Sequence, residues 1–143
     1  VEQPFPAKDI EKSEKLTRLS PLDIYADENS RNVDDIKKIK DSFNGINIKL
    51  MKCGSIEEAL KMIRQAKKYD LKIMLGCMIE TSVGITAAAS IASFADKVDL
   101  DGNLLIKNDP FDGVKVINGA LNLPNSTGLG LMLRNNNRNC LLL

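Results

Sequence analysis

The sequence predicts an α/β fold, the later part of a (β/α) TIM-type barrel with about five βα units, followed by a short C-terminal hairpin. Short apolar segments alternate with longer amphipathic segments, as strands alternate with helices in βα proteins. The predicted strands begin every 22 to 26 residues, which is the period of a βα unit and not of a β-sandwich or a helical array. The sheet is therefore expected to be parallel.

The predicted elements follow one another along the chain. Strands are expected to end near residues 1–3 and to span residues 22–26, 46–51, 72–77 and 98–100. Helices are expected over residues 9–18, 33–42, 55–68 and 82–94. The third of these helices has the clearest start, because Ser55 is followed three residues later by Glu58.

The βα pattern ends after Asp101, where a segment rich in Gly, Asn, Asp and Pro predicts turns. Alternating residues at 114–117 and 121–123 then predict a hairpin around Asn118-Gly119. We therefore expect a partial barrel over residues 1–133 and a disordered or non-native polar tail over residues 134–143. A complete barrel has eight strands, so the chain is expected to be cut from a longer protein and to be inactive alone.

Composition excludes several classes of function. The formal net charge of +1 offers no field for nucleic acid or a membrane surface, and no apolar segment approaches the length of about 18 residues that a membrane span needs. The three cysteines lack paired spacing, which indicates a reducing, cytoplasmic location. The sequence contains no histidine, so acid–base chemistry must use carboxylates, lysine or tyrosine, and a metal site would be oxygen-rich and suited to Mg²⁺ or Mn²⁺.

Charged residues stand where the predicted strands end, which is where βα folds carry their functional groups. Glu2, Asp27, Lys49, Asp99 and Asp101 are the candidates. The first three follow successive strands at intervals of 25 and 22 residues, and the interval of 50 residues to Asp99 corresponds to two repeats. These charges thus recur in step with the βα period.

The alternation of side chains along a strand sharpens the prediction for Lys49. One face of its strand is apolar and suited to packing on helices, and it consists of Ile46, Ile48 and Leu50. The residues of the other face are expected to point into the barrel, and they are Asn47, Lys49 and Met51. An unpaired ammonium inside a barrel is costly to desolvate. We therefore expect Lys49 to contact carboxylates, water or a substrate.

Structural alternatives remain open for each candidate. Glu2 can be a solvated acid, and Asp27 can be a favourable charge at a helix N-terminus or a turn residue before Asn29-Ser30. Lys49 can be a surface lysine with its apolar stem buried. Asp99 and Asp101 can be ordinary turn residues before a glycine. Lys52 is expected to be structural rather than chemical.

Five segments together resemble the enolase superfamily, its muconate-cycloisomerase-like branch, and within it dipeptide epimerases of the L-Ala-D/L-Glu epimerase type. The resemblance extends over about residues 1–133, and the order and spacing of the segments make it specific. The segments are Val1-Glu2-Gln3-Pro4, Tyr25-Ala26-Asp27-Glu28, Asn47-Ile48-Lys49-Leu50-Met51-Lys52-Cys53-Gly54, Gly76-Cys77-Met78-Ile79-Glu80-Thr81-Ser82-Val83-Gly84 and Asp99-Leu100-Asp101-Gly102.

The resemblance implies a role for each candidate. Glu2 and Asp27 match two of the family's three metal carboxylates, and Lys49 matches one of two lysines that act on opposite faces of the substrate α-carbon. Asp99 and Asp101 match the pair that holds the substrate's α-ammonium group. Glu2 and Asp27 match the second and third of these carboxylates, and the first carboxylate and the opposing lysine are expected upstream. A lysine that acts as a base also needs a lowered pKa.

The function implied by the resemblance is Mg²⁺-dependent epimerisation of dipeptides, with a small-molecule substrate and a possible homo-oligomer. An N-acylamino acid racemase, an o-succinylbenzoate synthase or a muconate cycloisomerase is the alternative within the branch, and a non-catalytic βα module is the alternative outside it. Asp99 and Asp101 distinguish a dipeptide epimerase from the other enzymes of the branch, because only an ammonium-bearing substrate needs carboxylates there.

Overall fold

A four-stranded parallel sheet forms the centre of the computed structural model, which describes residues 1–134. Its strands are hydrogen-bonded in the order in which they occur in the chain, and Glu2 adds an isolated parallel bridge to Tyr25 at one edge. The predicted parallel βα arrangement is therefore confirmed. The strands are β1 (Tyr25–Ala26), β2 (Gly45–Lys49), β3 (Lys72–Gly76) and β4 (Lys97–Val98).

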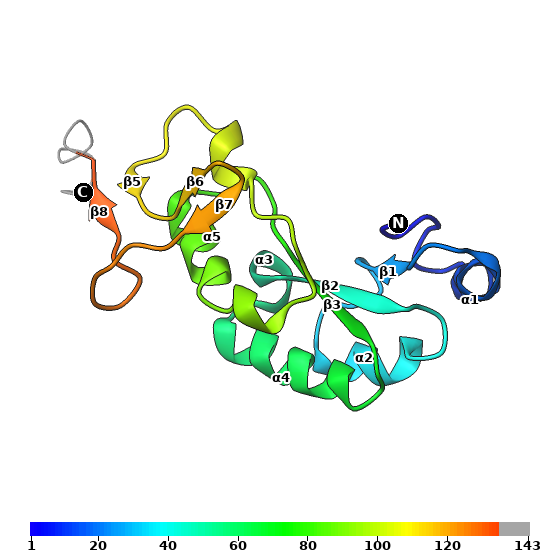
Figure 1. Ribbon diagram of the computed structural model, residues 1–143. Coiled ribbons are helices and arrows are strands. Elements are labelled where there is room, and N and C mark those ends of the chain that lie inside the picture. The colour runs from blue at the N-terminus through cyan, green and yellow to red at the C-terminus, as the bar shows by residue number, and fades with distance from the viewer. Residues whose placement is uncertain (135–143) are drawn as a thin grey trace.

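Helices connect and cover these strands. Helices α2 and α4 contact each other, and α4 packs on β2 and β3. Figure 1 shows α2 and α4 below the sheet and α1 at the edge of the molecule next to β1. Helix α5 lies beyond the end of β3 that is farther from α2. The helices are α1 (Ile10–Leu19), α2 (Val33–Ile39), α3 (Leu50–Cys53), α4 (Ile56–Lys67) and α5 (Ser82–Ala89), with short 3-10 helices η1 (Ala92–Phe94) and η2 (Gly102–Leu105).

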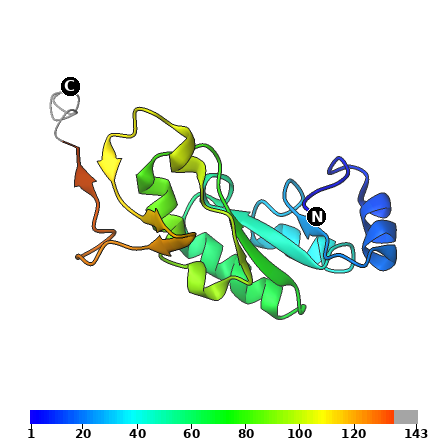
Figure 2. The ribbon, with the colours of Figure 1, turned by 45° about the horizontal axis from the view of Figure 1, so that its top comes forward.

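The C-terminal part contains two small antiparallel pairs, at the opposite end of the molecule from α1 (Figure 2). Strands β6 (Lys115–Ile117) and β7 (Ala120–Asn122) form the predicted hairpin, and β5 (Phe111–Asp112) pairs with β8 (Met132–Leu133). The hairpin turn has positive φ at both central residues, 51° at Asn118 and 79° at Gly119, as a tight two-residue turn requires. The predicted polar tail lies outside the described residues except for Arg134, whose backbone N–H donates to the Pro110 carbonyl.

The hydrophobic core lies between the sheet and its covering helices. Ile46, Ile48, Ile73 and Leu75 are at most 1% exposed and alternate with the residues of the other face, as the period of a strand requires. Packed against them are buried helix residues, including Ile36, Ile39, Ala59, Met62, Ile63 and Ala66. The predicted apolar face at residues 46 and 48 is therefore confirmed.

Large side chains on the other face of the sheet, the lumen face, lie across glycines of the neighbouring strand. A Cβ added at Gly45 would come within 2.5 Å of the Tyr25 ring, and one at Gly76 within 2.5 Å of Asn47 Oδ1. The parallel register places these pairs on adjacent strands. The absence of side chains at the two glycines thus makes room for Tyr25 and Asn47 beneath the strand ends.

Several predicted boundaries were wrong. Strand β2 ends at Lys49, because Leu50 begins α3, a single turn closed by Gly54 at φ 88°. Met51 is consequently 65% exposed on a helix and does not point into a barrel with Asn47 and Lys49. The predicted helix 82–94 is divided, since buried Ile91 leaves helical geometry at ψ 8°.

Other elements are also shorter than predicted. Strand β1 spans Tyr25–Ala26 instead of residues 22–26, helix α2 ends at Ile39 instead of residue 42, and β4 spans Lys97–Val98 instead of residues 98–100. These differences lie at element ends, where local pattern is the weakest guide.

Side-chain caps define the starts of α2 and α4. Asn32 accepts hydrogen bonds from the backbone N–H groups of Asp34 and Asp35, and Ser55 accepts one from Glu58 at 3.0 Å. The Glu58 carboxylate instead accepts from the Val33 N–H of α2 at 3.1 Å, so it ties the two helices together.

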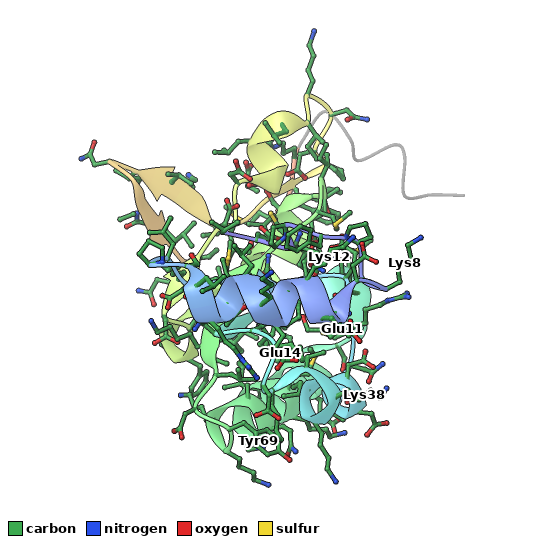
Figure 3. The ribbon with its side chains drawn as sticks, turned by 90° about the vertical axis from the view of Figure 1, so that its right-hand side faces the viewer. Lys8, Glu11, Lys12, Glu14, Lys38 and Tyr69 are labelled. Atoms are coloured by element: carbon green, nitrogen blue, oxygen red, sulfur yellow. The ribbon has the colours of Figure 1, made fainter. Side chains whose placement is uncertain are left out.

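Helix α1 presents charged side chains along its exposed side, among them Glu11, Lys12 and Glu14 (Figure 3). Lys12 pairs with Asp9 at 2.8 Å, and Arg18 pairs with Glu14. Within residues 1–134, no helix combines the length and the apolar character that crossing a membrane would require.

Candidate active site

Three charged side chains predicted as site residues meet at the ends of neighbouring strands. Asp27 directly follows β1, Lys49 is the last residue of β2, and Glu2 is bridged to β1. Lys49 Nζ lies 3.0 Å from Asp27 Oδ2 and 3.2 Å from Glu2 Oε1. We call these three residues the carboxylate–lysine cluster. Its formation confirms the expectation that Lys49 contacts carboxylates.

Burial makes the contacts of the cluster strong. The side chains of Lys49 and Asp27 are only 13% and 8% exposed, whereas that of Glu2 is 34% exposed. Charge-assisted hydrogen bonds in such surroundings are stronger than at the surface, and loss of one partner leaves the other charge without compensation. Glu2 is therefore partly exposed but paired, and Asp27 is buried and paired, while the Asp27 carbonyl also accepts from the Ser30 N–H at 3.0 Å as in a turn.

The protonation states follow from these contacts. Burial alone raises the pKa of Asp27, but hydrogen bonds from Lys52 and Lys49 outweigh it and hold that pKa below its usual value. Burial lowers the pKa of Lys49, but its hydrogen bonds to Asp27 and Glu2 hold it above its usual value. Lys49 is thus an ammonium group here, in contrast to the lowered pKa that a lysine base needs.

The structure adds three residues to which the sequence had given no chemical role. Lys52 on α3 forms an ion pair with Asp27 and lies 3.7 Å from Glu28, so Asp27 has two ammonium partners. Asn47 Nδ2 donates to Glu2 Oε1 at 2.7 Å, and Gln3 Oε1 accepts from the Asp27 N–H at 2.9 Å. The position of Asn47 on the lumen face, two residues before Lys49, is the signal that could have indicated it.

Asp99 and Asp101, the aspartate pair, lie beyond the end of β4 and are both exposed. The Asp99 N–H donates to the Leu75 carbonyl at 2.9 Å, and Asp101 precedes η2 with its carboxylate 4.0 Å from Cys77 Sγ. Within residues 1–134, neither carboxylate forms a salt bridge with Lys or Arg. The two acids therefore remain available as acceptors, but within residues 1–134 no hydrogen bond or salt bridge joins them to the carboxylate–lysine cluster.

The cluster offers donors suited to a hard divalent cation. Glu2 and Asp27 supply carboxylate oxygens to one shared cation, the Lys49 ammonium, which shows that both can face a single positive charge. Residues 1–134 contain no group of three acidic, cysteine or histidine side chains placed to bind a metal. The chain therefore fits Mg²⁺ as the source of two ligands, with further ligands required from elsewhere.

A cavity of about 650 Å³ is lined by residues of α1, α2 and α3 and of the segment before α2. Its lining includes Glu28, Lys52 and Cys53 but neither Lys49 nor Asp27. A reacting atom must approach the acid–base group within hydrogen-bond reach. This cavity is therefore not the place for a substrate of Lys49.

Known proteins resemble this chain in sequence and in fold. The enolase C-terminal domain-like family matches residues 1–137. L-Ala-D/L-Glu epimerase of Bacteroides thetaiotaomicron is 45% identical over 132 residues, which are 92% of this chain and 34% of that protein.

Solved structures of epimerases also resemble this chain in fold. The substrate-liganded L-Ala-D/L-Glu epimerase from Bacillus subtilis has a TM-score of 0.86 at 35% identity, covering 92% of this chain and 38% of that one. The dipeptide epimerase from Enterococcus faecalis, complexed with Mg and L-Leu-L-Tyr, has a TM-score of 0.83 at 36% identity, covering 92% and 39%. The chain thus spans between a third and two-fifths of the length of these relatives, and its sheet is the later part of a (β/α) barrel. By sequence and by fold, the chain belongs to the enolase C-terminal domain-like family.

Proposed function

We propose that the complete protein carrying this chain is a Mg²⁺-dependent dipeptide epimerase in which Lys49 is one of two acid–base groups. The observation that carries this proposal is the position of Lys49 Nζ, within 3.2 Å of two carboxylates at the strand ends. Relatives named as epimerases of L-Ala-D/L-Glu and of dipeptides support the reaction class, and the Mg of the Enterococcus faecalis complex supports the metal.

In this proposal Lys49 removes or returns the proton of the substrate α-carbon, and Glu2 and Asp27 hold the cation. Mg²⁺, when bound, supplies positive charge that stabilises the negative charge developing on the substrate carboxylate. A cation held by Glu2 and Asp27 would compete for the two carboxylates whose hydrogen bonds now raise the pKa of Lys49. Asn47 keeps the Glu2 carboxylate in place through its 2.7 Å hydrogen bond.

The aspartate pair is proposed to bind the α-ammonium group of a dipeptide. Both carboxylates are exposed and, within the described part of the chain, have no lysine or arginine partner, so a substrate cation can supply the missing charge. An N-acylamino acid, an o-succinylbenzoate precursor or a muconate brings no such cation. The pair therefore favours a free-amine dipeptide over these alternatives.

Replacement of Lys49 tests the proposal. In the complete protein, Lys49→Ala should slow exchange of the substrate α-proton with D₂O by about 10²- to 10⁴-fold for at least one epimer of an Ala-Glu dipeptide, followed by NMR. Lys38→Ala is the control, since the Lys38 side chain is 68% exposed on α2 and, among residues 1–134, forms a salt bridge only with Asp35. Unchanged exchange from both epimers in Lys49→Ala would reject the role of Lys49.

Substrate comparison separates the function classes. The wild-type protein should epimerise free-amine dipeptides faster than their N-acylated counterparts. The reverse order would indicate an acylamino acid racemase, and the absence of both exchange and Mg²⁺ binding would indicate a non-catalytic module.

A further inference from the structure

A buried chain of three polar side chains anchors the segment after the aspartate pair to the start of α5. Asp109 Oδ2 accepts from Ser82 Oγ at 2.6 Å and from the Ser82 N–H at 2.8 Å. Ser82 Oγ in turn accepts from Asn103 Nδ2 at 3.1 Å. We call Asp109, Ser82 and Asn103 the buried relay. Ser82 and Asp109 are 2% and 4% exposed, so the bonds between them are shielded from water, and Asn103 is partly buried.

Asp109 caps the start of α5, a role that usually belongs to the residue just before a helix. Thr81 is the N-cap residue of α5 by position, but its side chain makes no capping bond. One oxygen of the Asp109 carboxylate, 27 residues after Ser82, accepts instead from the Ser82 N–H, the first of the helix. The other oxygen accepts from the Phe111 N–H at 3.1 Å. A carboxylate is favourable at this end of a helix. The start of α5 is thus fixed by the segment that follows η2.

The relay also fixes the backbone beside Asp101. Asn103 lies within η2, the short helix that begins directly after Asp101, and the Leu104 N–H donates to the Asp101 carbonyl at 2.8 Å. A Cβ at Gly102 would lie 2.1 Å from the Met78 carbonyl oxygen, so η2 presses against the connection between β3 and α5. The position of Asp101 therefore depends on how η2 is held against α5.

We propose that the buried relay is a positioning device for recognition of the substrate ammonium group, acting on Asp101 through Asn103 and η2. The proposal rests on the proposed function, because it assigns to Asp101 a substrate contact. None of the three relay residues needs to touch the substrate. Their contribution is to keep an exposed carboxylate in its binding position before the substrate arrives.

Ser82→Ala is the sharpest test, because it removes the hydroxyl shared by Asp109 and Asn103 but keeps the Ser82 N–H that Asp109 caps. In the complete protein, KM for a free-amine dipeptide should rise about tenfold, since one positioning hydrogen bond is lost, while kcat stays within about twofold. The inhibition constant of a dipeptide analogue with hydrogen in place of the α-amino group should not change. Ser90→Ala is the control at the other end of α5, because Ser90 is the exposed C-cap residue and, within residues 1–134, its Oγ donates only to the Ala87 carbonyl.

A double variant shows whether the effect passes through Asp101. If it does, Ser82→Ala should add no further rise in KM to the Asp101→Ala variant. Asn103→Ala provides a second route, since it breaks the relay while keeping the Asp109–Ser82 bonds, and should reproduce the same pattern.

The proposal is overturned if KM rises equally for the free-amine dipeptide and its analogue, if the effects of Ser82→Ala and Asp101→Ala on KM multiply, or if Ser82→Ala behaves like Ser90→Ala. A wild-type protein that does not epimerise the dipeptide would instead reject the proposed function, and the relay's role with it.

Discussion

The two groups of charged residues at the strand ends are held in place in different ways. In the carboxylate–lysine cluster, Glu2, Asp27 and Lys49 contact one another, and the Lys49 and Asp27 side chains are 13% and 8% exposed. In the aspartate pair, both side chains are exposed, and the backbone is held by hydrogen bonds from the Asp99 N–H to the Leu75 carbonyl and from the Leu104 N–H to the Asp101 carbonyl. The first group is fixed by its own charges, whereas the second depends on the scaffold behind it.

Variants of the two groups are therefore expected to differ in whether they reduce stability or ligand binding. Removing a buried, paired charge leaves its partners uncompensated and therefore reduces stability. Removing an exposed carboxylate costs little stability and should affect only the ligand that it binds. Variants in the two groups can test this contrast.

Asp27→Ala should have the largest effect on stability. It removes the partner that Lys49 and Lys52 share, and the expected loss is about 3 kcal/mol in the free energy of unfolding, because Lys49 keeps only Glu2. Urea titration of the complete protein measures this loss. Asp112→Ala is the control, since its pair with Arg134 is exposed by 44% and 43% and should cost under about 1 kcal/mol. Equal losses in the two variants would remove the contrast between buried and exposed charges.

Gly76→Ala should have a smaller effect that reveals how tightly the cluster is packed. The added Cβ would lie 2.5 Å from Asn47 Oδ1 and 2.7 Å from Asn47 Nδ2, so the amide must move away from Glu2. We expect a loss of about 2 kcal/mol in the free energy of unfolding and a weaker Mg²⁺ affinity by calorimetry.

A second substitution separates the two consequences of Gly76→Ala. Asn47→Ala in the Gly76→Ala background removes the clash and should recover part of the stability, but the Mg²⁺ affinity should stay low because Glu2 still lacks its donor. An unchanged Mg²⁺ affinity in Gly76→Ala would show that Asn47 does not position Glu2.

Asp101→Asn should have the smallest effect on stability, within about 0.5 kcal/mol, because the side chain is exposed. It should nevertheless raise KM for a free-amine dipeptide, since the proposed ammonium contact loses its charge. Unfolding and steady-state kinetics on the same preparation test both parts. A large loss of stability with an unchanged KM would place Asp101 in the scaffold rather than in the binding site.

Much of the fold followed from local pattern. The alternation of Ile46 and Ile48 with polar neighbours predicted the buried face of β2, and Ser55 predicted the start of α4. The ends of elements were less predictable. Strand β2 stops at Lys49 because a turn of helix closed by Gly54 follows it, and an apolar Leu50 fits either continuation equally well.

The candidate site was predictable where a side chain lies at a strand end in step with the repeat. Glu2, Asp27 and Lys49 met this condition, and the structure brings them together. Asn47 and Lys52 were given no chemical role, because a neutral amide and a lysine on a short helix carry no period of their own. Their contacts depend on which strand lies next to which.

Local pattern was sufficient to predict the parallel βα order and the strand ends at which charges collect, because both follow from periods of two residues along a strand and of one repeat along the chain. The raised pKa of Lys49 and the capping of α5 by Asp109, 27 residues after Ser82, became visible only in the folded chain. Hydrogen bonds between residues far apart in the chain set both outcomes, and neither is a property of neighbouring residues.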